Sequence, residues 1–179
     1  MNKEENASKK EEEEVIKIVE EISEMLLKRI VPPHKKKSKE VTNDDMDRIV
    51  EEAKVLYALC FQPVGIYKGS FAVHHSQIDD KDPLNFFVTY ERKIVINLEI
   101  VKHSNYEVDS KESCLTFSQD NPIMIKRWQK IEVIYVTIMV DPDNKDKFRL
   151  SSAIKESLSG KDAFVFQHEF DHSEPKYIY

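Results

Sequence analysis

The sequence predicts an α+β domain, in which small antiparallel or mixed β-sheets pack around a C-terminal helix that carries the pattern HExxH. An extra amphipathic helix is expected to precede this domain. One observation is a set of β-rich segments between residues 86 and 150, the strongest of which is 131–140. The other is the helical spacing of His168, His172 and the apolar residues before them, which places them on one face. Strands that precede a helix with one apolar face are typical of the α+β class.

Residues 1–41 are expected to lie before this domain. Residues 1–10 are charged and nearly free of apolar side chains, which predicts a disordered tail. Residues 11–31 are expected to form the amphipathic helix, and the proline- and lysine-rich residues 32–41 a basic connector. The apolar positions of the helix are Val15, Ile18, Val19, Ile22, Met25, Leu26 and Ile30.

Residues 42–179 contain the remaining predicted elements. The first is a helix over 44–60, with Thr42 or Asn43 as its cap, and a short strand with a turn at 68–69 follows within 63–77. The others are a hairpin of 86–90 and 94–98, the strand 131–140, a turn at 141–144 and a strand at 148–150.

The C-terminal helix is expected to begin near Gly160, because Ser159 to Asp162 have the form of a capping box. It contains His168 and His172, which lie one turn apart on one face, so both rings can bind one metal ion. Glu169 follows the first histidine and can take a proton from water. The pattern therefore predicts a metal site for hydrolysis. The alternative is a charged surface helix, against which the apolar residues on the same face argue.

Two histidines leave a tetrahedral metal site incomplete, so a third protein ligand is expected. The chain has two cysteines. Cys60 ends a helical apolar stripe and is expected to be a core residue. Cys114 follows a polar loop without apolar periodicity, which makes it the candidate thiolate ligand. One thiolate and two imidazoles suit Fe(II) or Zn(II).

Three segments resemble the motifs of the peptide deformylase family, in the family's order. Residues 167–172 (QHEFDH) resemble its HExDH helix, and residues 112–116 (ESCLT) resemble its EGCLS segment. Residues 70–77 (SFAVHHSQ) resemble its GxGLAAxQ motif more weakly. The resemblance covers roughly residues 44 to 179, and it implies that 42–179 is a deformylase-like catalytic domain.

The resemblance implies a metal site made of Cys114, His168 and His172. These residues would bind one divalent metal ion, Fe(II) in the cell, with Zn, Ni or Co as substitutes. A bound metal ion lowers the pKa of its water, to roughly 7 in a well-known zinc enzyme, so that hydroxide is available at neutral pH.

The resemblance also implies the reaction, which removes the formyl group from the N-terminal formyl-methionine of nascent polypeptides and releases formate. Glu169 would take the proton of the attacking water and return it to the leaving amine. Gln77 and the backbone N–H of Leu115 would stabilise the oxygen that becomes negative when the formyl carbon is attacked.

Five residues depart from the family motifs: Ser70, Ala72, His74, His75 and Ser113. Three of them stand where the family has glycine, and their side chains could narrow the substrate cleft. Adjacent histidines on a strand point to opposite faces, so we expect one to face solvent and the other to line the cleft. Two alternatives therefore stay open: a metallohydrolase that acts on a different acyl or amide substrate, and a metal-binding homologue with weakened catalysis.

Composition argues against several other classes of protein. The net charge of −6 gives no reason to expect DNA binding, and no apolar run approaches the roughly 20 residues of a membrane helix. The N-terminus lacks the apolar core of a signal peptide, and two cysteines fit a reducing cytoplasm. The expected partners are formylated nascent peptides. The helix at 11–31 could pack on its own domain, form a dimer contact or meet the ribosome near the tunnel exit.

Overall fold

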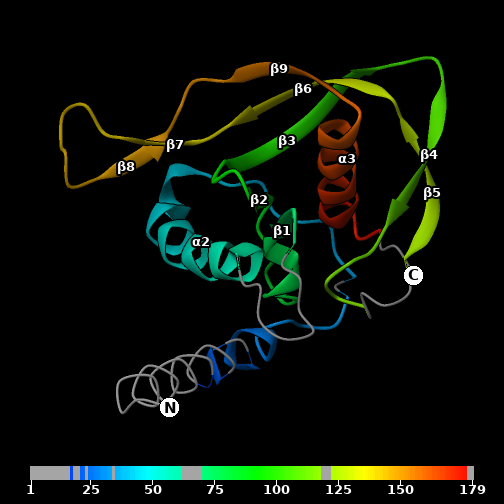
Figure 1. Cartoon of the computed structure of the whole chain (residues 1–179). Coiled ribbons are helices and arrows are strands. Elements are labelled where there is room, and N and C mark those ends of the chain that lie inside the picture. The colour runs from blue at the N-terminus through cyan, green and yellow to red at the C-terminus, as the bar shows by residue number, and fades with distance from the viewer. Residues whose placement is uncertain are drawn as a thin grey trace, which may run out of the picture.

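The computed structural model describes residues 17, 21–22, 24–33, 35–61, 70–117 and 122–176. At its centre is a five-stranded antiparallel sheet with the strand order β1-β2-β3-β6-β9 (Figure 1). Its strands are β1 (Ala72–His74), β2 (Phe86–Thr89), β3 (Ile94–His103), β6 (Lys130–Val136) and β9 (Ile154–Ser159). Two hairpins pair separately, β4 (Glu107–Glu112) with β5 (Ile123–Trp128) and β7 (Ile138–Val140) with β8 (Phe148–Leu150). The predicted α+β class is confirmed.

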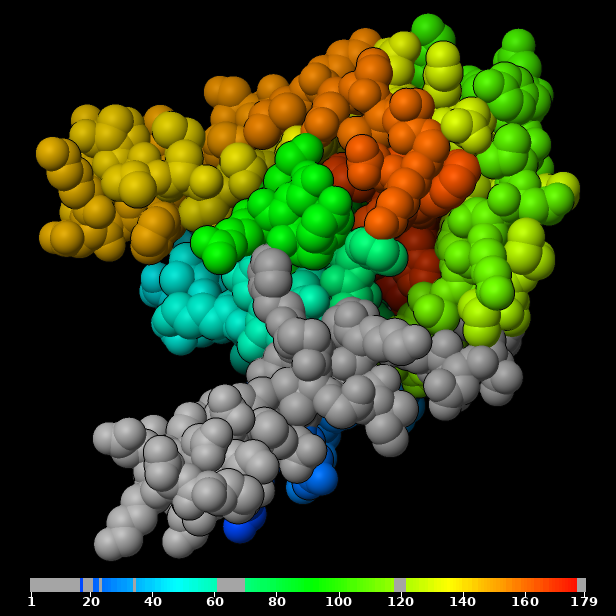
Figure 2. All heavy atoms as spheres, viewed as in Figure 1, coloured from blue at the N-terminus to red at the C-terminus, as the bar shows by residue number. Residues whose placement is uncertain are grey.

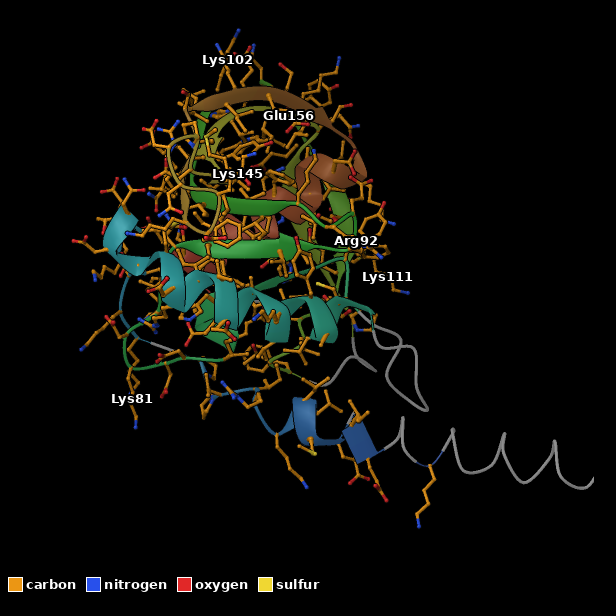
Figure 3. All side chains as sticks on the ribbon, turned by 90° about the vertical axis from the view of Figure 1, so that its left-hand side faces the viewer. Lys81, Arg92, Lys102, Lys111, Lys145 and Glu156 are labelled. Carbon is orange, nitrogen blue, oxygen red and sulfur yellow. The ribbon has the colours of Figure 1, made fainter. Side chains whose placement is uncertain are left out.

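Two helices cover opposite faces of this sheet, because alternate residues of β2 pack against different helices. Phe86 and Val88 share a buried cluster with α2 (Met46–Phe61), whereas Phe87 between them packs with α3 (Lys161–Ser173). The rings of Phe87 and Phe166 meet edge to face, with their centroids 5.2 Å apart. Successive residues of a strand point to opposite faces, so a strand covered on both sides needs an uninterrupted apolar run. Figure 3 shows α2 along one side of the sheet, with Lys81 and Lys102 pointing outward.

The predicted strand 131–140 is divided between two sheets. Thr137 interrupts it, because its N–H donates to Ser151 Oγ (3.0 Å) and its hydroxyl donates to the Ile94 carbonyl (2.8 Å). Beyond this residue the chain continues as β7, and the turn predicted at 141–144 leads into β8. The apolar run therefore predicts the strands, and side-chain hydrogen bonds decide where the sheet changes.

Strands β4, β5 and β9 carry charged side chains and have no long apolar run, so the sequence pattern does not predict them. β4 lies just before Cys114, where a polar loop was expected. It pairs with β5 from Glu107 opposite Trp128 to Glu112 opposite Ile123. This hairpin sits beside α3 rather than in the central sheet (Figure 1).

The predicted capping box at the start of α3 is wrong. Ser159 is the last residue of β9, and no side chain caps the helix. Gly160 turns the chain from strand to helix at φ 59° and ψ −132°, a conformation that glycine adopts without the clash a Cβ would cause. Its N–H donates to the Gln129 carbonyl (2.9 Å). The helix nevertheless begins at Lys161, next to the predicted position.

The N-terminal region is described in part. Residues 21–22 and 24–27 are helical, as predicted, whereas the predicted tail at 1–10 and the turn at 68–69 lie outside the described residues. Leu26 and Ile30 pack against the cluster of α2. Among the helices that the structure describes, none combines the length and the apolar character needed to cross a membrane.

The connector after this helix is attached to the domain by backbone hydrogen bonds. The N–H of Val31 donates to the Gln77 carbonyl, and that of Ser38 donates to the Ser173 carbonyl at the end of α3 (both 2.9 Å). Ser38 and Val41 are buried. The second helix then begins as predicted, with Thr42 as the cap of a 3-10 turn, η1 (Asn43–Asp45), that runs directly into α2.

Candidate metal centre

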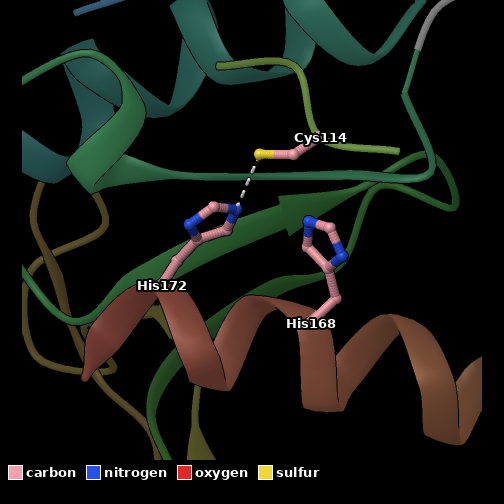
Figure 4. Close-up of side chains that lie close together, drawn as sticks. All are labelled: Cys114, His168 and His172. Carbon is pink, nitrogen blue, oxygen red and sulfur yellow. Dashed lines mark hydrogen bonds between the residues drawn. The ribbon is translucent and has the colours of Figure 1, made fainter. Parts of the chain in front are cut away.

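α3 and the loop after β4 bring Cys114, His168 and His172 together, and all three side chains point into one space (Figure 4). Cys114 Sγ lies 3.3 Å from His172 Nε2, and one ligand atom of each residue lies within 4.8 Å of the others. Donor atoms this close suit bonds of about 2.0–2.3 Å to a single ion. The three residues can therefore hold a divalent metal ion.

Glu112 orients His168. Its Oε2 lies 3.0 Å from His168 Nδ1, which leaves Nε2 as the nitrogen available to a metal ion. Burial alone would raise the pKa of Glu112, but its hydrogen bonds with His168 and Arg127 lower that pKa to about 2. Sequence reasoning missed this role, although Glu112 stands two residues before Cys114 in the quoted motif.

Arg127 ties this carboxylate to α3. It is buried on β5, and it forms two hydrogen bonds of 2.9 Å with Glu112 and one with Asp171. Burial alone would lower the pKa of Arg127, but the two carboxylates raise it above its usual value. The β4–β5 hairpin thus positions His168 through Glu112 and is itself held against α3.

We expect Arg127→Met to lower the free energy of unfolding by about 3 kcal/mol, because it leaves the carboxylates of Glu112 and Asp171 without their buried partner. Urea unfolding of the metal-loaded protein measures this change. Lys126→Met is the matched control, since Lys126 is the preceding residue, largely exposed, and pairs with Asp109 at the surface, where about 0–1 kcal/mol is expected. Equal destabilisation by the two substitutions would contradict the structural role of Arg127.

Glu169 is buried next to His168. Its side chain is only 3% exposed, and no described residue forms a hydrogen bond with its Oε2. Burial raises the pKa of Glu169 to about 7, although the neighbouring His168 opposes the shift. A buried carboxylate oxygen without a partner is costly, and a bound water would satisfy it. Together with the thiolate and imidazole donors, this oxygen fits a site that holds a metal ion and a water molecule.

Gln77 reaches the same site from the 3-10 turn η2 (His75–Gln77) that follows β1. Its Nε2 donates to Thr116 Oγ1 (3.1 Å) and faces Cys114 Sγ (3.7 Å), while its Oε1 accepts the His74 N–H (2.9 Å). Leu115 follows Cys114 in a turn, and its side chain packs against the cluster of α2. In Figure 2, α3 is visible at the bottom of a hollow between β1 and the β4–β5 hairpin.

Two expectations about nearby residues have different outcomes. Cys60 is buried in the cluster of α2, which confirms that it is a core residue. His74 and His75 were expected to divide between solvent and cleft, but both are fully buried. β1 ends at His74, and the chain then enters η2, so the alternation of a strand does not apply to this pair.

Comparison with known proteins identifies a family. The sequence model of the family described as Polypeptide deformylase matches residues 13–179. No significant match is found among curated proteins. The match to the family begins at residue 13 and so includes most of the helix predicted at 11–31, which the comparison of motifs alone leaves outside.

Solved structures share the fold. The chain is 26% identical to a peptide deformylase from Thermotoga maritima, with a TM-score of 0.62 over 79% of this chain and 84% of that one. It is 21% identical to a deformylase of a Vibrio parahaemolyticus bacteriophage in complex with actinonin, with a TM-score of 0.64 over 83% and 95% of the two chains. For a deformylase from Acinetobacter baumannii the identity is 18% and the TM-score 0.60, over 82% and 95%.

Proposed function

The chain belongs to the polypeptide deformylase family of metallohydrolases, and we propose that it removes the formyl group from the N-terminal formyl-methionine of nascent polypeptides. One observation carries the proposal beyond family membership. Cys114, His168 and His172 converge beside Glu169, a buried carboxylate with a free oxygen among the described residues. A purely structural metal site has no need of such a base.

The donor set determines which metal fits. We propose that Cys114, His168 and His172 hold one divalent ion, Fe(II) in the cell, which Zn, Ni or Co can replace. A bound ion of this kind supplies Lewis acidity, which makes water reactive at neutral pH. The hydrogen bond that His168 Nδ1–H donates to Glu112 supports this ligand set, because it leaves the other ring nitrogen available.

The protein's own groups move the proton and stabilise the developing charge. Glu169 takes a proton from the attacking water and returns it to the leaving amine, and its burial, which raises its pKa, favours its acting as the proton acceptor. Gln77 Nε2 and the Leu115 N–H donate to the oxygen that becomes negative when the formyl carbon is attacked. The position of the Gln77 amide beside Cys114 supports this assignment.

The side chains at the family's glycine positions leave the proposed reaction feasible. The methyl group of Ala72 is buried in the cluster of α3, and the Ser70 hydroxyl donates to the Ala72 carbonyl (2.6 Å). Ser113 is exposed. Two of the three side chains, those of Ser70 and Ala72, therefore make contacts within the protein. This favours a formylated peptide as the substrate over the alternative of a different acyl group.

Formate release from an N-formyl-methionyl tripeptide tests the proposal. The protein is prepared anaerobically and reconstituted with Fe(II) or Ni(II), and we expect turnover that requires the metal and disappears with a chelator. An acetylated tripeptide of the same sequence is the control for substrate class. Turnover of the acetylated peptide alone, or no turnover with one metal ion bound per chain, would refute deformylation.

Two further expectations stay predictions: contact with the ribosome near the tunnel exit and a cytoplasmic location. The N-terminal helix exposes Ile22 and Met25, which could meet the ribosome or a second copy. Leu26 and Ile30 pack on the domain, which supports packing on its own domain as the role of this helix over a dimer contact or contact with the ribosome.

A further inference from the structure

His75 is a buried histidine that belongs to no metal ligand set proposed above. Its side chain is fully buried, and its ring stacks on Phe86 with centroids 4.8 Å apart. The Leu84 N–H donates to His75 Nδ1 (2.9 Å), so the lone pair is on Nδ1 and the proton on Nε2. That Nε2 lies 2.5 Å from Glu52 Oε2, to which it donates. The pair connects α2 to η2.

Arg48 completes the network from the outside. Its guanidinium bonds to Glu52 Oε2 (3.0 Å), to Asp79 Oδ2 (2.7 Å) and to Asp82 Oδ2 (3.0 Å). Glu52, His75 and Asp79 are close enough to hold a cation, but Arg48 already supplies the positive charge there. Burial alone would raise the pKa of Glu52, and the hydrogen bonds from His75 and Arg48 lower it, so the carboxylate stays charged and fixed. The cluster is a structural network rather than a second metal site.

This network fixes the short turn that presents Gln77. η2 has three residues, of which His75 is the first and Gln77 the last. A shift of the His75 ring therefore moves Gln77 with it. We propose that Glu52 and His75 are positioning residues, which hold the Gln77 amide against Cys114 through η2. This inference rests on the proposed function, in which Gln77 stabilises the developing negative oxygen.

The first test compares two substitutions of Glu52. Glu52→Ala removes the acceptor for His75 Nε2–H. We expect kcat to fall by an amount approaching the 10²- to 10³-fold typical when an oxyanion donor such as the Gln77 amide is lost, with KM little changed. Glu52→Gln keeps an acceptor oxygen and is expected to retain most of the activity. Glu51→Ala is the matched control on the same helix, because Glu51 is exposed and its one ion pair among the described residues is with Lys54. A Glu52→Gln variant as inactive as Glu52→Ala would overturn the proposal.

A double-mutant cycle separates positioning from general destabilisation. If Glu52 acts through Gln77, then adding Glu52→Ala to Gln77→Ala lowers kcat no further. If Glu52→Ala lowers kcat as much in the Gln77→Ala background as it does alone, Glu52 acts elsewhere. His75→Asn serves as a second variant should Glu52→Ala not fold. It keeps an acceptor for the Leu84 N–H but is too short to reach Glu52, so it is expected to behave as Glu52→Ala does.

A spectroscopic measurement tests the same inference without activity. In protein loaded with Co(II), the thiolate-to-cobalt absorption reports the surroundings of Cys114 Sγ, which the Gln77 amide faces at 3.7 Å. We expect Gln77→Ala and Glu52→Ala to shift this band in the same direction, while Glu52→Gln and Glu51→Ala leave it in place. An unshifted band in Glu52→Ala or in Gln77→Ala overturns the proposal. This comparison tests the positioning role even if the protein releases no formate. The absence of formate release would refute the proposed function alone.

Discussion

Cys114→Ser is expected to leave the protein without bound metal and therefore without hydrolytic activity. Cys114 is 3% exposed and contributes the only sulfur of the group, 3.3 Å from His172 Nε2. A serine hydroxyl does not ionise at neutral pH and is a harder donor, so the remaining two imidazoles would bind the ion weakly. His172→Ala is expected to have the same result. The metal content per chain, measured after gel filtration, checks both.

Cys60→Ala is the matched control, because Cys60 is the other cysteine of the chain and is also buried. It is expected to keep one metal ion per chain and full activity, with at most a modest loss of stability. Stoichiometric metal in Cys114→Ser or in His172→Ala would refute the proposed ligand set. Equal loss of metal in Cys60→Ala would point to unfolding rather than ligation.

Glu169→Gln is expected to keep the metal and lose turnover. The substitution preserves shape but removes the base, and proton transfer by a positioned side chain typically contributes 10²- to 10⁴-fold, so kcat should fall by that order. Stability should not fall, because a neutral amide is less costly to bury than a carboxylate whose oxygen has no partner among the described residues. Formate release, metal content and thermal unfolding together check the three expectations.

Glu174→Gln is the control for this substitution, since Glu174 is the C-cap of the same helix and pairs with Lys37. It is expected to leave turnover unchanged. Turnover of Glu169→Gln close to that of the unmodified chain would refute the role of Glu169 as the base. Loss of metal or of the folded state in that variant would instead show that the carboxylate is structural.

The elements with strong local patterns are those that sequence reasoning predicts. The hairpin of β2 and β3, the helix α2 and the start of α3 lie at or next to their predicted positions, because an apolar run or a helical stripe is visible within a short window. β4 and β9 have no such pattern. β4 forms because β5, beyond a loop, supplies its hydrogen bonds, and β9 forms because β6 does so. Pairing between distant segments has no signature in either segment alone.

The candidate site divides in the same way. His168, Glu169 and His172 lie within five residues of one helix, so their shared face follows from helical spacing. Cys114 enters the prediction by its motif, but its 3.3 Å approach to His172 spans 58 positions of the chain. The partners Glu112 and Arg127 escape prediction because a charged residue in an unpredicted strand resembles a solvated one. The pair of Glu52 with His75 escapes it because the two residues are 23 positions apart, so neither shows its partner within a short window.

The sequence by itself determined the class of the fold, the helix that carries the metal-binding histidines and the chemistry of the donor set, because each depends on the spacing or identity of neighbouring residues. Only the tertiary structure decided that His74 and His75 are buried, that Arg127 links β5 to α3, and that Glu52 reaches η2. Those contacts join segments far apart in the chain. Their energies arise from burial and from hydrogen bonds that exist only once the sheet and both helices have packed together.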